Sequence, residues 1–264
     1  LFTPASNNKL YTSLGALILL GMDYSFETSV HHDSTFLVLK GGGDPDLTLS
    51  QLDSLAAVVA SRVKSVDMLI LDDTHLDSIP LGEGWMWDEG PWWYAAQISA
   101  LSVNDNVVDF IVSPGSAGAS IEVTLSPETD YISVINNSVT VNDTTGFHEL
   151  KIERNWLHET NDFLITGNLM DTTSVDTLYR NIEDPTMFTG TVFREILEVR
   201  NVPVKSIEKG NLPIDFRVLA SHRSAPLLES VTNMMKESDN LTAELLIKTM
   251  GRENSGTQGT WKNG

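Results

Sequence analysis

Residues 113–180 follow a different sequence pattern from the rest of the chain. Short runs with the alternation of β-strands, such as ASIEVTLS and HELKIERNWL, are separated there by turns rich in Asn, Asp, Ser, Gly and Pro. This spacing is typical of a small all-β module. The flanking regions mix helical and strand-like patterns, as α/β folds do. We therefore expect several domains, with a β-rich part inserted into a mixed α/β framework.

Helical spacing is clearest in three regions on either side of the β-rich part. In the first of them, apolar residues recur at Leu10, Leu14, Leu17, Ile18 and Met22. Thr48 is a suitable N-cap for the second helix. The pattern predicts helices over residues 5–22, 48–62 and 185–200 and two more after residue 224, with strands over 25–30, 34–41, 66–71, 97–112, 202–210 and 216–223.

Charge and composition exclude several classes of function. Acidic residues outnumber basic ones by 36 to 17, for a net charge of −19, so nucleic acid is not an expected partner. The chain has no cysteine, which excludes disulfides and thiolate catalysis. His31, His32 and Asp33 lack a third ligand at a suitable spacing, and we interpret them as the polar tip of a hairpin. We expect no metal, no cofactor and no membrane span.

Ser6 and Lys9 stand at the start of the first predicted helix. Side chains at i and i+3 lie on one face of a helix, so the hydroxyl and the amine are expected to meet. A lysine whose pKa is lowered by burial or by a nearby cation can take the proton of a serine. Backbone N–H groups of a first helical turn can also bind an oxyanion. The pair is therefore a candidate nucleophile and base.

The Ser-x-x-Lys spacing is weak evidence by itself, since it recurs at Ser61 and Ser206. Ser6 differs from these two because a Ser-Asp-Asn sequence follows at 238–240, which is 232 residues further along the chain. The combination of Ser-x-x-Lys, Ser-Asp-Asn and Lys-Thr-Gly is typical of penicillin-binding proteins and class A β-lactamases. In that mechanism Ser238 passes a proton toward the leaving group, while Asn240 holds the substrate amide and helps to orient Lys9.

The third motif of this set, Lys-Thr-Gly, is missing from the sequence. The nearest match is K-T-M-G at 248–251. It falls at the end of a predicted amphipathic helix, whereas the motif belongs on a strand beside the site, and Met250 breaks its spacing. The chain begins with Leu and shows no signal peptide. We therefore expect a fragment at both ends, with the third motif outside it.

Taken together, these stretches closely resemble the class C low-molecular-mass penicillin-binding proteins of the penicillin-binding protein 4 type, which are D-alanyl-D-alanine carboxypeptidase/endopeptidases. The resemblance runs nearly end to end and is weakest in the β-rich part. It implies a transpeptidase-like catalytic domain into which a second domain is inserted, with a third domain inserted into the second. The stretches that carry it are FTPASNNKLYTSLGAL, LVLKGGGDPDLT, LILDDTHLD, GWMWDEGPWWYAAQISALSVNDN and ASHRSAPLLESVTNMMKESDNLTAELLIKTMG.

The expected fold is therefore a mixed α/β and α+β multidomain one. It would contain an incomplete serine hydrolase domain of the penicillin-binding-protein/β-lactamase type, a nested mixed α/β domain and a small all-β domain. The boundaries expected from the change of pattern and the resemblance are 1–27 with 222–264 for the catalytic domain, 28–112 with 186–221 for the second and 113–185 for the third.

The resemblance also implies a reaction and its partners. Ser6 would attack the penultimate D-alanine of a peptidoglycan stem peptide, release the terminal D-alanine and form an acyl-enzyme that water hydrolyses. β-Lactam antibiotics would acylate the same serine, and the enzyme would work outside the cytoplasm, in the cell wall, the periplasm or the medium. Family members hold the amine of diaminopimelate with an acidic group of the second domain, and Asp88 is our candidate for it.

Other readings remain open from the sequence. The four tryptophans of residues 85–93 can form a hydrophobic plug with solvated charges beside it. A β-lactamase or an esterase on the same fold would need a base for deacylation, and we identify none. A catalytically inactive cell-wall binding homologue or fragment would not need Ser6, Lys9, Ser238 and Asn240 intact.

Overall fold

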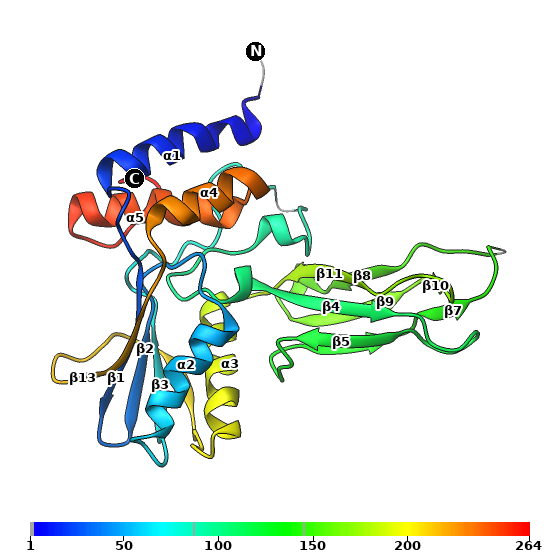
Figure 1. The fold of residues 1–264 in the computed structure, drawn as a ribbon, viewed down its shortest axis with the longest axis horizontal. Coiled ribbons are helices and arrows are strands. Elements are labelled where there is room, and N and C mark those ends of the chain that lie inside the picture. Colours follow the sequence, from blue (N-terminus) through cyan, green and yellow to red (C-terminus); the bar gives the residue numbers. More distant parts are fainter. Residues whose placement is uncertain (1–2, 87, 145) are drawn as a thin grey trace.

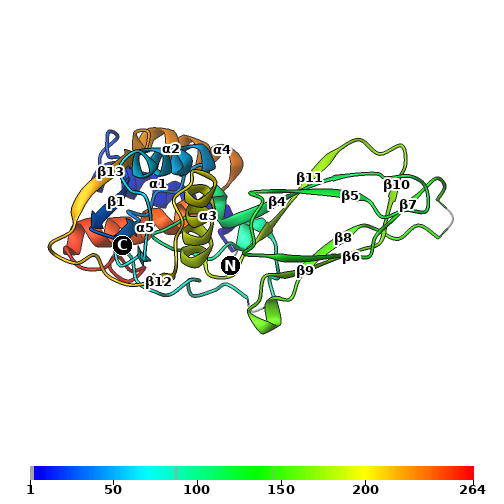
Figure 2. The ribbon, with the colours of Figure 1, turned by 90° about the horizontal axis from the view of Figure 1, so that it is seen from below.

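The computed structural model describes residues 3–86, 88–144 and 146–264. Figure 1 shows three parts: a layer of helices that carries both ends of the chain, a sheet with helices packed against it, and an elongated β-rich part that projects to one side. Figure 2 shows the β-rich part extending away from the helices in a second view. The predicted multidomain fold with mixed α/β and α+β character is confirmed.

The helical layer joins residues from the two ends of the chain. Its helices pack through a small apolar cluster, to which Ala16, Met234 and Leu246 each contribute from a different helix. The layer consists of the 3-10 turn η1 (Ala5–Asn7), α1 (Asn8–Leu19), α4 (Leu227–Glu237) and α5 (Asn240–Ser255).

The predicted helix over residues 5–22 is confirmed as η1 followed by α1, but its apolar stripe is mostly not buried. Ala16 faces the other helices, whereas Leu10, Leu14 and Ile18 are 57%, 58% and 71% exposed. The stripe therefore points away from α5 and is left uncovered by the described part of the chain.

The central sheet brings the two ends of the chain together. Its strand order is β12-β3-β2-β1-β13, in which β1 pairs antiparallel with β2 and β13, while β3 is parallel to β2 and β12. Since β1 follows α1 and β13 precedes α4, their pairing places α1 beside α4 and α5. The strands are β1 (Glu27–Asp33), β2 (Phe36–Lys40), β3 (Met68–Asp72), β12 (Ile207–Lys209) and β13 (Arg217–Arg223).

Two helices cover the sheet, α2 (Leu49–Ala60) and α3 (Pro185–Val199), and both predictions are confirmed. Thr48 caps α2 as expected: its side chain accepts a hydrogen bond from the backbone of Gln51, whose side chain accepts one from the backbone of Thr48. This reciprocal cap fixes the start of α2 directly after the glycine-rich loop that leaves β2.

The histidines that we interpreted as a hairpin tip lie inside a strand instead. His31 and His32 belong to β1, where they pair with Val38 and Leu37 of β2. The turn falls at residues 34–35, and Ser34 adopts a φ of +52° there. The two imidazoles therefore project from opposite faces of the strand, because successive side chains alternate.

The β-rich part is built from three small sheets, with strand orders β11-β4-β5, β6-β9-β8 and β10-β7 among the described residues. β4 pairs with β5 and β11, although the expected boundary at 112/113 would assign it to the second domain. The strand predicted over 97–112 begins only at residue 107. The strands are β4 (Val107–Ser113), β5 (Glu122–Ser126), β6 (Ser133–Asn136), β7 (Val139–Val141), β8 (Lys151–Arg154), β9 (Asp162–Thr166), β10 (Asn168–Met170) and β11 (Asp176–Asn181).

Candidate active site

Ser6 and Lys9 lie where the chain turns into α1. Ser6 belongs to η1 and is exposed, whereas Lys9, in the first turn of α1, is only 6% exposed. The ammonium of Lys9 donates a hydrogen bond of 3.3 Å to the Ser6 hydroxyl. Ala5, directly before Ser6, has a φ of +48°, a conformation that costs an alanine on the order of 1 kcal/mol. The serine is thus presented at a strained bend beside a buried lysine.

The Ser-Asp-Asn sequence forms the junction between α4 and α5. Ser238 ends α4 in the left-handed conformation, with a φ of +59°. Asp239 caps α5, because its carboxylate accepts hydrogen bonds from the backbone N–H groups of Leu241 and Thr242. The cap fixes the turn, so that Ser238 and Asn240 can project toward the start of α1.

Hydrogen bonds connect all four of the predicted residues. The Ser238 hydroxyl donates to the Ser6 hydroxyl at 2.8 Å. The Lys9 ammonium donates to the side-chain oxygen of Asn240 at 2.5 Å. Ser6 therefore accepts from Ser238 and from Lys9, and Lys9 is held between Ser6 and Asn240. The structure brings together residues 232 positions apart in the sequence.

Burial lowers the pKa of Lys9 from its ordinary value, and the carboxylates of Asp239 and Glu244 partly oppose this shift. Desolvation disfavours the charged ammonium, so the neutral amine is reached at a lower pH than in a free lysine. A neutral amine 3.3 Å from a serine hydroxyl is in a position to remove its proton.

Two further groups lie beside these residues and were not identified from the sequence. The side-chain N–H of Asn240 donates to the backbone carbonyl of Tyr94 at 2.9 Å. Glu244, one turn further along α5, accepts a hydrogen bond of 3.2 Å from the indole of Trp85. No residue-type signal could reveal the Tyr94 contact, since it uses a backbone atom. The i, i+4 spacing of Asn240 and Glu244 is the one available hint, because it puts both on one face of α5.

Asp88 does not belong to this hydrogen-bonded group. Its carboxylate is exposed and lines a cavity of about 410 Å³ next to the β-rich part, together with Glu149 of the segment before β8 and Arg180 of β11. Of the four tryptophans considered as a hydrophobic plug, Trp87 lies outside the described residues, and Trp92 and Trp93 are not buried, since they are 44% and 42% exposed.

The K-T-M-G sequence lies on α5, as predicted, and does not line the site. Lys248 is fully buried and donates hydrogen bonds of 2.6 Å to Asp77 and to the carbonyl of Ile79. Its ammonium also lies 3.7 Å above the ring of Trp261. These contacts give Lys248 a structural role in holding the end of the chain.

Two other features are absent from the described residues 3–86, 88–144 and 146–264. Within these ranges, no three His, Cys, Asp or Glu residues are grouped so as to hold a metal ion. In the same ranges, no helix is both long enough and apolar enough to cross a membrane.

A serine at a helix start that contacts the lysine of its Ser-x-x-Lys sequence and the serine of a Ser-Asp-Asn sequence matches the motif pattern of penicillin-binding serine hydrolases. Comparison with known proteins agrees with this class. The model of the D-Ala-D-Ala carboxypeptidase 3 (S13) family matches residues 1–264, so the chain belongs to this family.

Two curated relatives match nearly the whole chain. A D-alanyl-D-alanine carboxypeptidase of Actinomadura sp. (strain R39) is 37% identical over 281 aligned residues, which cover 99% of this chain and 52% of that protein. A penicillin-sensitive carboxypeptidase A of Dictyostelium discoideum is 26% identical over 96% of this chain and 53% of its own length. The chain thus spans about half the length of the curated relatives that it matches.

The solved structures give the same fold. The crystal structure of penicillin binding protein 4 (dacB) from Haemophilus influenzae superposes with a TM-score of 0.81 at 20% identity, over 99% of this chain and 60% of that one. A second structure of that protein, complexed with a novel β-lactam, gives a TM-score of 0.72 at 19% identity over 98% of this chain and 57% of the other.

Proposed function

We propose that this chain provides the nucleophile, the base and the proton donor of a serine-type D-Ala-D-Ala carboxypeptidase that acts on peptidoglycan stem peptides. The observation that carries the proposal is the hydrogen-bonded group of Ser6, Lys9, Ser238 and Asn240, in which the lysine is buried. Membership of the D-Ala-D-Ala carboxypeptidase family supports the same reaction.

In the proposed acylation, Lys9 takes the proton of Ser6 as its oxygen attacks the carbonyl carbon of the penultimate D-alanine. The backbone N–H of Ser6 is the donor that we assign to the oxyanion, because the N–H groups of Asn7 and Asn8 already donate within the turn. The tetrahedral intermediate then collapses and the peptide bond breaks. Ser238, which donates to Ser6 at 2.8 Å, gives its proton to the departing amine of D-alanine and is reprotonated by Lys9, which thereby returns to its neutral form.

Deacylation reverses these roles. A water molecule takes the place of the departed D-alanine, loses a proton toward Lys9 and attacks the ester carbonyl on Ser6. The ester bond breaks, the shortened stem peptide leaves, and the Ser6 oxygen recovers its proton. β-Lactams acylate Ser6 by the same attack on their ring carbonyl. A β-lactam complex has been solved for the structurally similar Haemophilus influenzae protein.

The proposal has three further parts, which concern the substrate amine, the location of the activity and the domains. Asp88 binds the amine of diaminopimelate in the stem peptide, since an exposed carboxylate suits an ammonium group. The activity resides outside the cytoplasm, where peptidoglycan is found. The chain contributes to three domains, and the pairing of β4 with β5 supports a start of the third domain at 107 rather than 113.

Release of D-alanine from a synthetic stem peptide by the intact protein tests the function. We expect Ser6→Ala to abolish release and Ser61→Ala, which changes the serine of the second Ser-x-x-Lys sequence, to leave it unchanged. Equal loss in both variants, or none in Ser6→Ala, contradicts the proposal. Rapid hydrolysis of β-lactams without release of D-alanine would instead establish a β-lactamase.

A further inference from the structure

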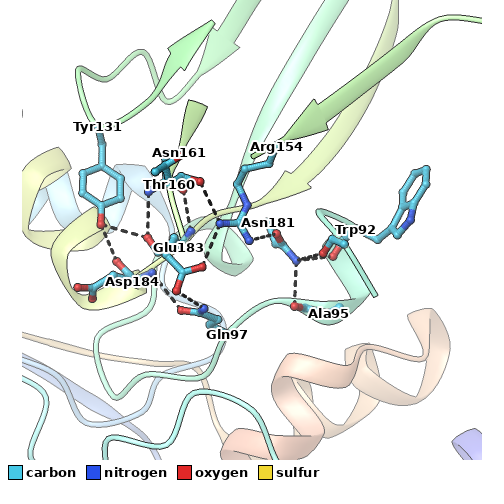
Figure 3. Close-up of polar contacts among 11 residues, drawn as sticks. Trp92, Ala95, Gln97, Tyr131, Arg154, Thr160, Asn161, Asn181, Glu183 and Asp184 are labelled. Carbon is cyan, nitrogen blue, oxygen red and sulfur yellow. Dashed lines mark hydrogen bonds and ion pairs between the residues drawn. The ribbon is translucent and has the colours of Figure 1, made fainter. Parts of the chain in front are cut away.

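The segment 80–97, which we name the tryptophan loop, is anchored to the base of the β-rich part. Figure 3 shows Asn181 pointing at the backbone of this loop, and its side-chain N–H groups donate to the carbonyls of Trp92 and Ala95 at 3.0 and 2.9 Å. At the end of the loop, Gln97 donates to Glu183 at 2.6 Å. The C-terminal part of the loop, residues 92–97, is therefore held by the β-rich part.

The other side of the tryptophan loop rests on α5, through Glu244. One carboxylate oxygen of this half-buried residue accepts the indole N–H of Trp85 at 3.2 Å, and the other accepts the indole N–H of Trp261. Both oxygens are thus used as acceptors. A glutamine could satisfy only one of the two indoles, because its amide has a single acceptor oxygen.

The loop position matters for Asn240 because Tyr94 belongs to the same loop. The Tyr94 carbonyl accepts the Asn240 amide N–H at 2.9 Å, which leaves the amide oxygen facing Lys9 at 2.5 Å. Without that carbonyl, the amide could rotate once Lys9 is neutral and donate its N–H groups to the amine. The loop therefore sets which side of the Asn240 amide meets Lys9.

We propose that Glu244 is a positioning residue: by clamping Trp85 and Trp261, it holds the tryptophan loop against α5, so that the Tyr94 carbonyl keeps the Asn240 oxygen directed at Lys9. This inference rests on the proposed function, since it concerns how efficiently Lys9 activates Ser6. Glu244 acts through these contacts without touching the reacting atoms. Its carboxylate also raises the pKa of Lys9 against the effect of burial.

The test compares Glu244→Ala and Glu244→Gln with wild type in the intact protein, using the rate of acylation by a fluorescent penicillin as a function of pH. We expect Glu244→Ala to slow acylation about 10- to 100-fold, because small displacements of catalytic groups have effects of this size. Glu244→Gln keeps one indole contact but loses the charge. We expect a smaller decrease in rate and a shift of the acidic limb of the pH profile to lower pH.

Glu253→Gln is the matched control. Glu253 lies on the same helix and also accepts a side-chain hydrogen bond, from the Tyr24 hydroxyl at 3.1 Å. We expect it to change neither the rate nor the pH limb. If thermal unfolding shows that Glu244→Ala does not fold, Glu244→Gln alone provides the test. Acylation within about two-fold of wild type at the pH optimum in the folded Glu244 variants would overturn the inference even if the pH limb moves, because loss of the charge alone moves that limb. A wild type that is not acylated at Ser6 would overturn the proposed function and this inference with it.

Discussion

At the scale of single residues, the proposed chemistry depends on one buried amine with two partners. Lys9 reaches Ser6 and Asn240 at the same time and is nearly excluded from water. Burial favours the neutral form that a base requires, while the Asn240 oxygen fixes where the amine points. The site therefore combines a shifted pKa with a fixed geometry, and neither would suffice alone.

Lys9→Arg separates charge from proton transfer. A guanidinium keeps the positive charge but cannot be deprotonated in a protein, so it cannot act as the base. We expect acylation by penicillin to slow by roughly 10²- to 10⁴-fold. Lys64→Arg, in the second Ser-x-x-Lys sequence, should leave the rate unchanged. An active Lys9→Arg variant would show that Lys9 serves only as a cation.

The four residues of the candidate site were predictable because their types and order form a recognisable combination. Ser6, Lys9, Ser238 and Asn240 indeed lie within hydrogen-bonding distance of one another along a chain of contacts. Tyr94 and Glu244 were not predictable, since a backbone carbonyl has no sequence signature and the partners of a half-buried glutamate depend on tertiary structure. The role of Asp88 stays a prediction.

At the scale of elements, sequence patterns predicted where the helices lie better than which of their faces are buried. Thr48 was expected to begin a helix, and the reciprocal contacts with Gln51 confirm it. The apolar stripe of α1 was equally clear, yet Leu14 and Ile18 are mostly exposed. Periodicity indicates which face is apolar but not which surface meets it.

His31 was placed in a turn because polar residues resemble turns locally, whereas pairing with β2 and β13 makes it part of a strand.

The glycine-rich loop after β2 contains Asp44, a carboxyl that is 2% exposed and has one oxygen without a hydrogen bond. Burial raises the pKa of Asp44 from 3.8 to about 7, although the backbone N–H of Asp46 favours the charged form. His222 lies 3.9 Å away, and burial lowers its pKa, so it does not compensate the charge. In the folded protein Asp44 thus prefers to be protonated.

Asp44→Asn tests whether the folded protein favours the protonated form of Asp44. Because the folded state binds the proton more tightly, Asp44 causes stability to fall as pH rises from about 4 to about 7. The asparagine retains an acceptor for the Asp46 N–H and lacks the charge. We expect the variant to match wild type near pH 4 and to exceed it above pH 7, by up to about 4 kcal/mol in the free energy of unfolding. Urea unfolding at several pH values measures this; a difference that does not vary with pH would contradict it.

At the scale of the whole molecule, the β-rich part is joined to the rest through a polar network. Arg154 at the end of β8 is 5% exposed in its side chain and forms an ion pair of 3.0 Å with Glu183, just before α3 (Figure 3). Arg154 also donates to Asn181 at 3.2 Å. The same network anchors the tryptophan loop, so the junction connects the β-rich part to the loop beside the candidate site.

Glu183→Ala removes the carboxylate and leaves the Arg154 charge buried. Loss of one partner of a buried pair typically costs about 3–5 kcal/mol, because the remaining charge is uncompensated. Denaturant unfolding should show a loss of this size. Glu198→Ala breaks the more exposed pair between Arg194 and Glu198, whose side chains are 30% and 45% exposed and lie 3.8 Å apart, and should cost at most about 0.5 kcal/mol. Equal effects of the two substitutions would contradict a structural role for the junction.

The change of sequence pattern indicates a β-rich part within a mixed α/β framework, and the domain limits expected from it stay a prediction. Residues 107–112 look apolar and strand-like whichever sheet they join. Only the pairing of β4 with β5 and β11 shows that they lie with the β-rich part. Likewise, the Ser-x-x-Lys and Ser-Asp-Asn sequences lie far apart in the chain, and the pairing of β1 with β13 shows how they meet.

The central claim is that Ser6 is the nucleophile, and the most direct test is to locate the covalent adduct. The intact protein would be incubated with a labelled penicillin, digested and analysed by mass spectrometry. We predict one adduct, on the peptide that contains Ser6, and its loss in Ser6→Ala but not in Ser61→Ala. No adduct in wild type, or an adduct on any other residue, would contradict the account.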